Sequence, residues 1–168
     1  MTKLQKQEHL KALVDYYGAD ILDSEAYHQS DKYLQHNNVS TLEHTISVAC
    51  MCIKISRALH IKSDEMSLVR GALLHDFFLY DWHSPKSTRP PHHPTHHGSY
   101  ALSNASELFS INPIEADMIK EHMFPVTIKP PKHRETYILT IADKVCGLKE
   151  SFSKPFFYPI VKDLKNNG

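Results

Sequence analysis

The sequence predicts an all-α domain. Apolar residues recur at steps of three and four in several separate stretches, which is the spacing that one buried helix face requires. No stretch alternates apolar and polar residues for long enough to predict a half-buried strand. The length of 168 residues fits a single domain, and such a chain buries about two-thirds of its unfolded surface. We therefore expect one helical bundle of about six to eight helices.

Most of the expected helices have a recognisable start or stop. Gly18 follows the first periodic stretch as a C-terminal stop. Ser40 or Thr41 can cap the next long helix, and Asn112 before a proline opens a later one. Residues 35–39 read as a loop, and the prolines between residues 82 and 94 predict a longer loop that could cover a site. The expected helices cover residues 4–17, part of 21–33, 41–60, 63–76, 97–109, 113–123, 134–152 and 159–165.

The composition excludes several classes of partner. Lys plus Arg equals Asp plus Glu at 19 each, so the chain has no overall basic field for nucleic acid. Three cysteines match neither a metal-binding pair nor a disulfide framework. No start resembles a signal peptide and no apolar run is long enough to cross a bilayer, so we expect a soluble cytoplasmic protein without a membrane partner. A small molecule is the expected partner, and the sequence also allows a homodimer.

Residues 71–83 carry the strongest chemical signal. His75 and Asp76 stand in a run that is apolar on nearly every side, where an unpaired carboxylate would be very costly. A metal ion would remove that cost, because an imidazole and a carboxylate together suit zinc, iron or manganese. The carboxylate also has two oxygens with which to bridge two ions. A buried His-Asp hydrogen-bonded pair is the alternative.

Other histidines and one aspartate extend this signal, and the total of thirteen histidines points to metal. His44 lies on the apolar stripe of its helix, where a satisfied core histidine is the alternative. His122 lies at the end of a short helix, and Asp143 stands among apolar neighbours inside another.

The histidines between residues 92 and 97 are harder to separate. His97 shares a helix face with residues 101, 104, 105 and 108, whereas His96 lies about 100° round the helix and stays a live alternative. His92 and His93, in the proline-rich loop, read as lid or surface residues.

In order and character these residues resemble the H…HD…H…H…D pattern of the HD-domain superfamily of metal-dependent phosphohydrolases. The flanks agree: Ala-Leu-Leu precedes His75, Ile-Lys-Glu precedes His122, and Lys144 follows Asp143. The resemblance spans residues 40–150 and is specific, because it fixes five motifs in order. It implies a single HD domain over residues 1–168, with the N-terminal helix and the C-terminal tail packed on the motif-bearing core.

The resemblance also implies a binuclear centre of two divalent transition-metal ions. Iron or manganese is preferred, and zinc, nickel or magnesium is possible. A hydroxide shared by two ions roughly 3.5–4 Å apart would be the nucleophile. The implied ligands are His44, His75, Asp76 and Asp143 for the first ion, and Asp76, His97 and His122 for the second.

Further residues are expected to act on the substrate. Leu79 departs from the resemblance, since relatives often carry lysine or glutamate three residues after the His-Asp pair. Asp81 and His83 lie just beyond and could supply the missing polar function, and Lys144 is expected to contact phosphate. Ordinary solvated side chains are the alternative in each case. The expected catalytic residues are Asp76, Asp81 and Lys144, and the expected substrate-binding residues are His83, Lys86, Arg89 and Lys144.

The sequence thus predicts an enzyme, a phosphohydrolase that acts on a phosphate ester or anhydride of a small molecule, with a nucleotide or dinucleotide preferred. Two alternatives stay open. One is a di-iron oxygenase with the same ligand pattern. The other is a non-catalytic module that binds a nucleotide or transmits a signal.

Overall fold

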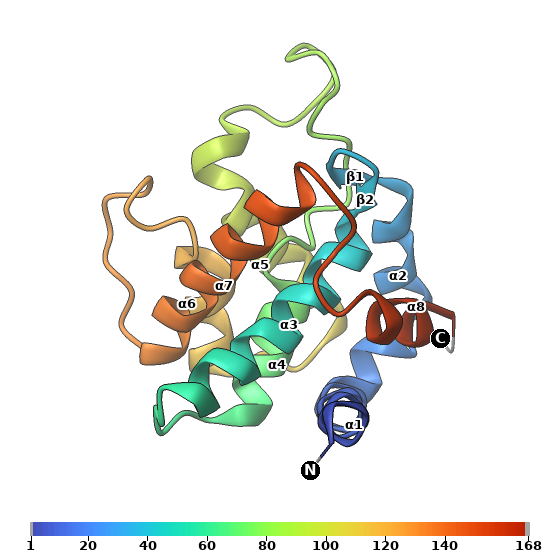
Figure 1. Ribbon diagram of the computed structural model, residues 1–168. Helices are drawn as coiled ribbons and strands as arrows, with labels where there is room; N and C mark the ends of the chain where they lie inside the picture. Colours follow the sequence, from blue (N-terminus) through green and yellow to red (C-terminus); the bar gives the residue numbers. More distant parts are fainter. Residues whose placement is uncertain (1, 167–168) are drawn as a thin grey trace.

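The computed structural model describes residues 2–166 as a bundle of helices with one small hairpin (Figure 1). This architecture confirms the all-α prediction. Within the described residues, none of the helices has both the length and the hydropathy that crossing a membrane requires. The elements are α1 (Lys3–Leu22), α2 (Glu25–His28), the 3-10 helix η1 (Gln29–Lys32), β1 (Leu34–His36), β2 (Val39–Ser40), α3 (Thr41–Ala58), α4 (Glu65–Leu74), α5 (His93–Leu108), α6 (Pro113–Glu121), α7 (Arg134–Glu150) and α8 (Tyr158–Asn166).

Helix α3 is the centre of the bundle. It packs against α4 and α7, and it also contacts α1 and α8. Nearly every residue of its first three turns is buried, which is the pattern of a helix enclosed on all sides. Its start is fixed by a capping box, in which the Ser40 hydroxyl accepts from the Glu43 amide at 3.2 Å and the Glu43 carboxylate accepts from the Ser40 amide at 3.1 Å.

Two local predictions were wrong. Gly18 does not end the first helix, because α1 continues to Leu22. Gly18 packs against α4 instead, where a β-carbon would come 2.5 Å from Leu73 Cδ1 and would force that side chain to shift. Residues 35–39 are not a plain loop, because β1 and β2 form an antiparallel hairpin. Its turn contains Asn37, whose φ of 48° is one that asparagine tolerates well.

Helix ends near the expected site also differ from prediction. Helix α4 ends at Leu74, so His75 and Asp76 lie just beyond its last helical turn. Helix α5 begins at His93, earlier than expected, with Pro94 in its first turn, where a missing amide hydrogen costs nothing. The proline-rich loop is therefore shorter than the sequence predicts.

An ionic network links α1, α4 and α6. Arg70 of α4 donates to the Glu115 carboxylate at 2.9 Å and also pairs with Asp20 of α1. Glu115 stands in the first turn of α6 and completes its capping box. The network therefore fixes how α6 enters the bundle, and with it the position of His122 at the other end of that helix.

Helices α5 and α6 approach closely at Gly98. A β-carbon at this position would lie 2.7 Å from the carbonyl oxygens of both Ile119 and Lys120. Backbone atoms of a packed helix cannot move aside as a flexible side chain could. The absence of a side chain at Gly98 therefore sets the spacing between its neighbour His97 and the end of α6.

We expect Gly98→Ala to destabilise the fold by about 1–3 kcal/mol, the usual cost of overpacking. Thermal unfolding should show this as a melting temperature several degrees lower. Ser99→Ala, at an exposed position on the same helix, is the matched control and should leave the melting temperature nearly unchanged. Equal melting temperatures for the two variants would contradict the close packing of α5 on α6.

Candidate metal centre

Histidine and aspartate side chains from α3, α5, α7 and the ends of α4 and α6 meet in the middle of the bundle. Five of the six are buried, and the Asp143 side chain is 16% exposed. The structure thus brings together all of the ligands that the sequence predicts, whereas His96 is exposed. They form a first group of His44, His75, Asp76 and Asp143, and a second group of Asp76, His97 and His122.

The carboxylate of Asp76 belongs to both groups. Its Oδ2 lies 3.3 Å from His75 Nε2 and 3.9 Å from His44 Nε2. Its Oδ1 lies 3.4 Å from His97 Nε2 and 3.6 Å from His122 Nε2. Each oxygen therefore faces one group, which is how a carboxylate must lie to bridge two ions.

Asp143 completes the first group. Its Oδ1 lies 3.0 Å from His44 Nε2 and 3.7 Å from His75 Nε2. Gln35 of β1 also reaches the centre and donates to Asp76 Oδ2 at 2.6 Å.

All four imidazoles are oriented by the same device, an acceptor at Nδ1. Such an acceptor fixes a proton on Nδ1 and leaves Nε2 to face the centre. The pairs are His75 Nδ1 with the Ala72 carbonyl at 2.8 Å, His97 Nδ1 with the His93 carbonyl at 2.8 Å, His122 Nδ1 with the Ile119 carbonyl at 2.9 Å, and His44 Nδ1 with Glu150 Oε2 at 2.6 Å.

The second group shows best that the centre fits a cation. His97 Nε2 and His122 Nε2 lie 2.8 Å apart, and with both protons on Nδ1 neither ring has a hydrogen to offer the other. The nearby Asp76 Oδ1 is buried and has no hydrogen-bond partner among residues 2–166. Facing lone pairs and an unpaired carboxylate oxygen repel unless a positive charge lies between them. Neutral imidazoles with a carboxylate suit a divalent transition metal.

The pKa values show a difference between the two groups. Burial lowers the pKa of His122 to about 3, and the neighbouring His97 and His75 act in the same direction. Burial would lower the pKa of His44 too, but its hydrogen bonds to Asp143 and Glu150 outweigh burial and raise the pKa to about 9. His122 is therefore neutral near pH 7, whereas an ion that binds His44 must displace a proton.

A cavity of about 410 Å³ opens onto the centre. Gln35 and His36 of β1 line it from one element, and Trp82 and His93 line it from the loop and from α5. Lys144 of α7 is the only lysine or arginine among the described residues that line it. Such a cavity is of a size that takes a small molecule.

The other expected substrate-binding cations lie elsewhere. Lys86 and Arg89 line a separate hollow of about 400 Å³ beside the start of α5. The Arg89 guanidinium binds the carbonyl oxygen of Trp82 within the loop. The structure therefore places only Lys144 of the expected cations at the cavity.

Asp81 and His83 also lie outside the cavity. Asp81 accepts from the His83 amide at 2.9 Å and from the Ser84 hydroxyl at 3.0 Å, and these hydrogen bonds lower the pKa of its carboxyl. Both side chains line a hollow beside the hairpin. Leu79 packs against the hydrophobic core.

Sequence reasoning missed Gln35, His36 and Glu150 and took His93 for a surface or lid residue. His93 is buried, stacks on Trp82 with the two rings 3° from parallel, and pairs through Nδ1 with the Tyr80 hydroxyl at 2.7 Å. A signal for Glu150 was available, because it follows Asp143 by seven residues and so lies on the same face of α7. No comparable signal existed for the hairpin residues.

Comparison with known proteins agrees with this geometry. The family description "HD domain" matches residues 41–148, which include every residue of both groups. Neither the curated proteins nor the solved structures gave a significant match. HD domains are characteristic of metal-dependent hydrolases and bind divalent metals through histidine and aspartate side chains such as those assembled here. With nearly two-thirds of its length matched, the chain belongs to the HD-domain family.

Proposed function

We propose that the protein is a metal-dependent phosphohydrolase that removes one phosphoryl group from a small phosphorylated molecule. The observation that carries this proposal is the position of Asp76, whose two oxygens face two separate imidazole groups beside an open cavity. Bridging carboxylates of this kind hold pairs of ions in enzymes that cleave phosphate esters.

The chain's own residues would divide the work as follows. The first and second groups would each hold one ion, with iron or manganese preferred, and Asp76 would belong to both sites. When bound, the two ions would supply an activated water molecule as nucleophile and neutralise charge on the phosphoryl oxygens. Lys144, on the cavity wall next to Asp143, would bind a phosphate oxygen and hold the phosphoryl group in place.

The lining of the cavity supports a substrate with a single phosphate. A polyphosphate carries several negative charges, yet Lys144 is the one permanent cation among the described lining residues. Trp82, Met123 and Leu148 give the remaining wall a largely apolar character. We therefore propose a phosphomonoester whose other part is uncharged and flat, with a nucleoside monophosphate preferred to a nucleoside triphosphate or a dinucleotide.

Metal content is the first test. Protein reconstituted with manganese should hold about two ions per chain by elemental analysis, and Asp76→Ala should lose both, because it deletes the residue shared by the two groups. His97→Ala and His122→Ala should each lose one ion. His96→Ala, an exposed neighbour, is the control and should keep both. A wild-type protein that takes up no metal would refute the proposed centre.

Phosphate release is the second test. The reconstituted protein should release phosphate from a nucleoside monophosphate at the same rate with and without oxygen, and should hydrolyse the corresponding triphosphate at least tenfold less efficiently. A strict requirement for oxygen would favour a di-iron oxygenase with the same ligands. Two bound ions without turnover of any phosphorylated compound would favour a non-catalytic binding module.

The role of Lys144 gives a third test. We expect Lys144→Met to keep its metal content while kcat/KM falls about tenfold or more, the loss of one charge-assisted contact of roughly 1.5–3 kcal/mol. A Lys86→Ala, Arg89→Ala double variant removes two cations that lie outside the cavity and should stay within about twofold of wild type. The reverse order of effects would place phosphate recognition in the loop instead of on α7.

A further inference from the structure

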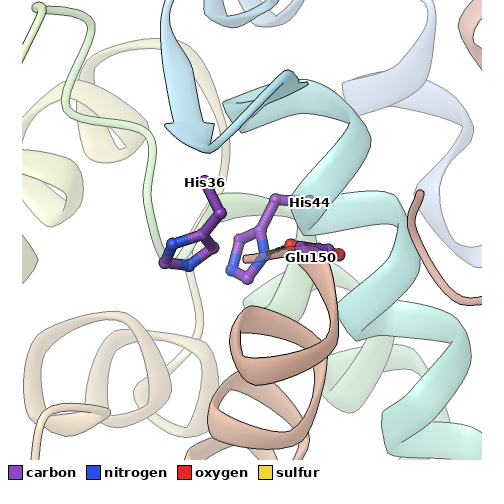
Figure 2. A group of neighbouring side chains, drawn as sticks. All are labelled: His36, His44 and Glu150. Carbon is purple, nitrogen blue, oxygen red and sulfur yellow. Dashed lines mark hydrogen bonds and ion pairs between the residues drawn. The ribbon is translucent and has the colours of Figure 1, made fainter. Parts of the chain in front are cut away.

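Glu150 is a fully buried carboxylate directly behind the candidate metal centre. It stands in the last turn of α7, and its Oε2 lies 2.6 Å from His44 Nδ1. Figure 2 shows the His44 ring between the Glu150 carboxylate and the ring of His36, which packs edge-on against His44 with ring centroids 5.2 Å apart. Glu150 therefore touches a predicted ligand but not the cavity.

Helix α7 holds His44 by both of its ring nitrogens. Asp143 Oδ1 lies 3.0 Å from Nε2, and two helical turns later Glu150 Oε2 accepts the proton on Nδ1. The second oxygen of Glu150 is buried and has no hydrogen-bond partner among the described residues. A buried carboxylate needs a compensating positive charge. For Glu150 that charge can come through the imidazole of His44, polarised by an ion at its other nitrogen.

Among residues 2–166, the other three imidazoles have no carboxylate partner at Nδ1. His75, His97 and His122 each donate from Nδ1 to a neutral backbone carbonyl. An ionised acceptor makes a stronger hydrogen bond than a carbonyl and makes the opposite nitrogen a better electron donor to metal. The first group therefore contains one imidazole of enhanced basicity, and the second group contains none.

A separate ion between His36, His44 and Glu150 is the competing explanation, because one ligand atom from each lies within 4.8 Å of the others. The geometry argues against it. The separation of 2.6 Å between His44 Nδ1 and Glu150 Oε2 is that of a short charge-assisted hydrogen bond. An ion at Nδ1 would also remove the proton that directs His44 Nε2 towards Asp143.

We propose that Glu150 is a positioning residue that keeps a proton on His44 Nδ1 and thereby makes the first group the tighter of the two metal sites. This inference rests on the proposed metal centre. It assigns Glu150 no contact with the substrate.

Calorimetric titration of metal-stripped protein with manganese tests the proposal. Wild type should bind two ions in two steps of different affinity. Glu150→Gln should weaken the tighter step by about 10–100-fold, the usual effect of removing such a partner, and leave the weaker step within about twofold. Glu135→Gln is the matched control. Glu135 is also buried on α7, but it accepts from the Asp64 amide at 3.0 Å, away from the centre, and its loss should change neither step.

Nuclear magnetic resonance of the zinc-loaded protein measures the chemical shift of the His44 ring proton. This shift would not change if Glu150 only stabilised the fold. Wild type should show the His44 proton on Nδ1, far downfield, and Glu150→Gln should shift it upfield, because a neutral amide is a weaker acceptor. The wild-type spectrum alone is decisive if the variant does not fold, since a proton on Nε2 would overturn the proposal. Unchanged affinities in a folded Glu150→Gln protein would overturn it while leaving the metal centre intact. A wild type without manganese binding would overturn both.

Discussion

The arrangement of helix ends around the candidate metal centre depends on how the negative charge of Asp76 is compensated inside the bundle. The carboxylate lies just past the last turn of α4, is 2% exposed, and faces imidazoles from three other helical segments. Each of these segments must end or pass at one particular place for its histidine to point inward. The close approach of α5 to α6 at Gly98 and the ionic network of Arg70 serve this same requirement. Helix packing and ionic contacts therefore both help to hold the histidine side chains around Asp76.

Much of this arrangement could be predicted from the sequence, because its causes are local. Helical periodicity predicted the long helices, caps such as Asn112 predicted where helices begin, and the ordered His and Asp motifs predicted which side chains would meet. What could not be predicted depends on contacts between distant segments. Gly18 was taken for a helix stop because nothing in its own neighbourhood indicates that Leu73 would pack against it. The positions of Arg89 and Asp81 depend on loop hydrogen bonds that have no periodic signal.

The contribution of the hairpin to the cavity could not be predicted from the sequence either. Its two strands are too short to alternate, yet it brings Gln35 and His36 to the cavity. The ring of His36 lies against α7 at Gly147, where a β-carbon would come 2.8 Å from His36 Nε2 and would force the ring to shift. Glycine is unfavourable inside a helix, but the missing side chain at Gly147 leaves room for the His36 ring on the cavity wall.

The predicted ligands come from segments spread over a hundred residues of chain, between His44 and Asp143, and only His75 and Asp76 are adjacent. An unfolded chain therefore offers an ion only one pair of adjacent ligands. A zinc finger differs, because its closely spaced ligands can bind a metal before the rest of the chain is ordered. Maturation of this protein should accordingly run in a fixed order, with the bundle folding first and the metal entering last through the cavity. Newly made apoprotein would then be a compact species that takes up ions from the surrounding metal pool, so the metal bound at the end would depend on the conditions in which the protein matured.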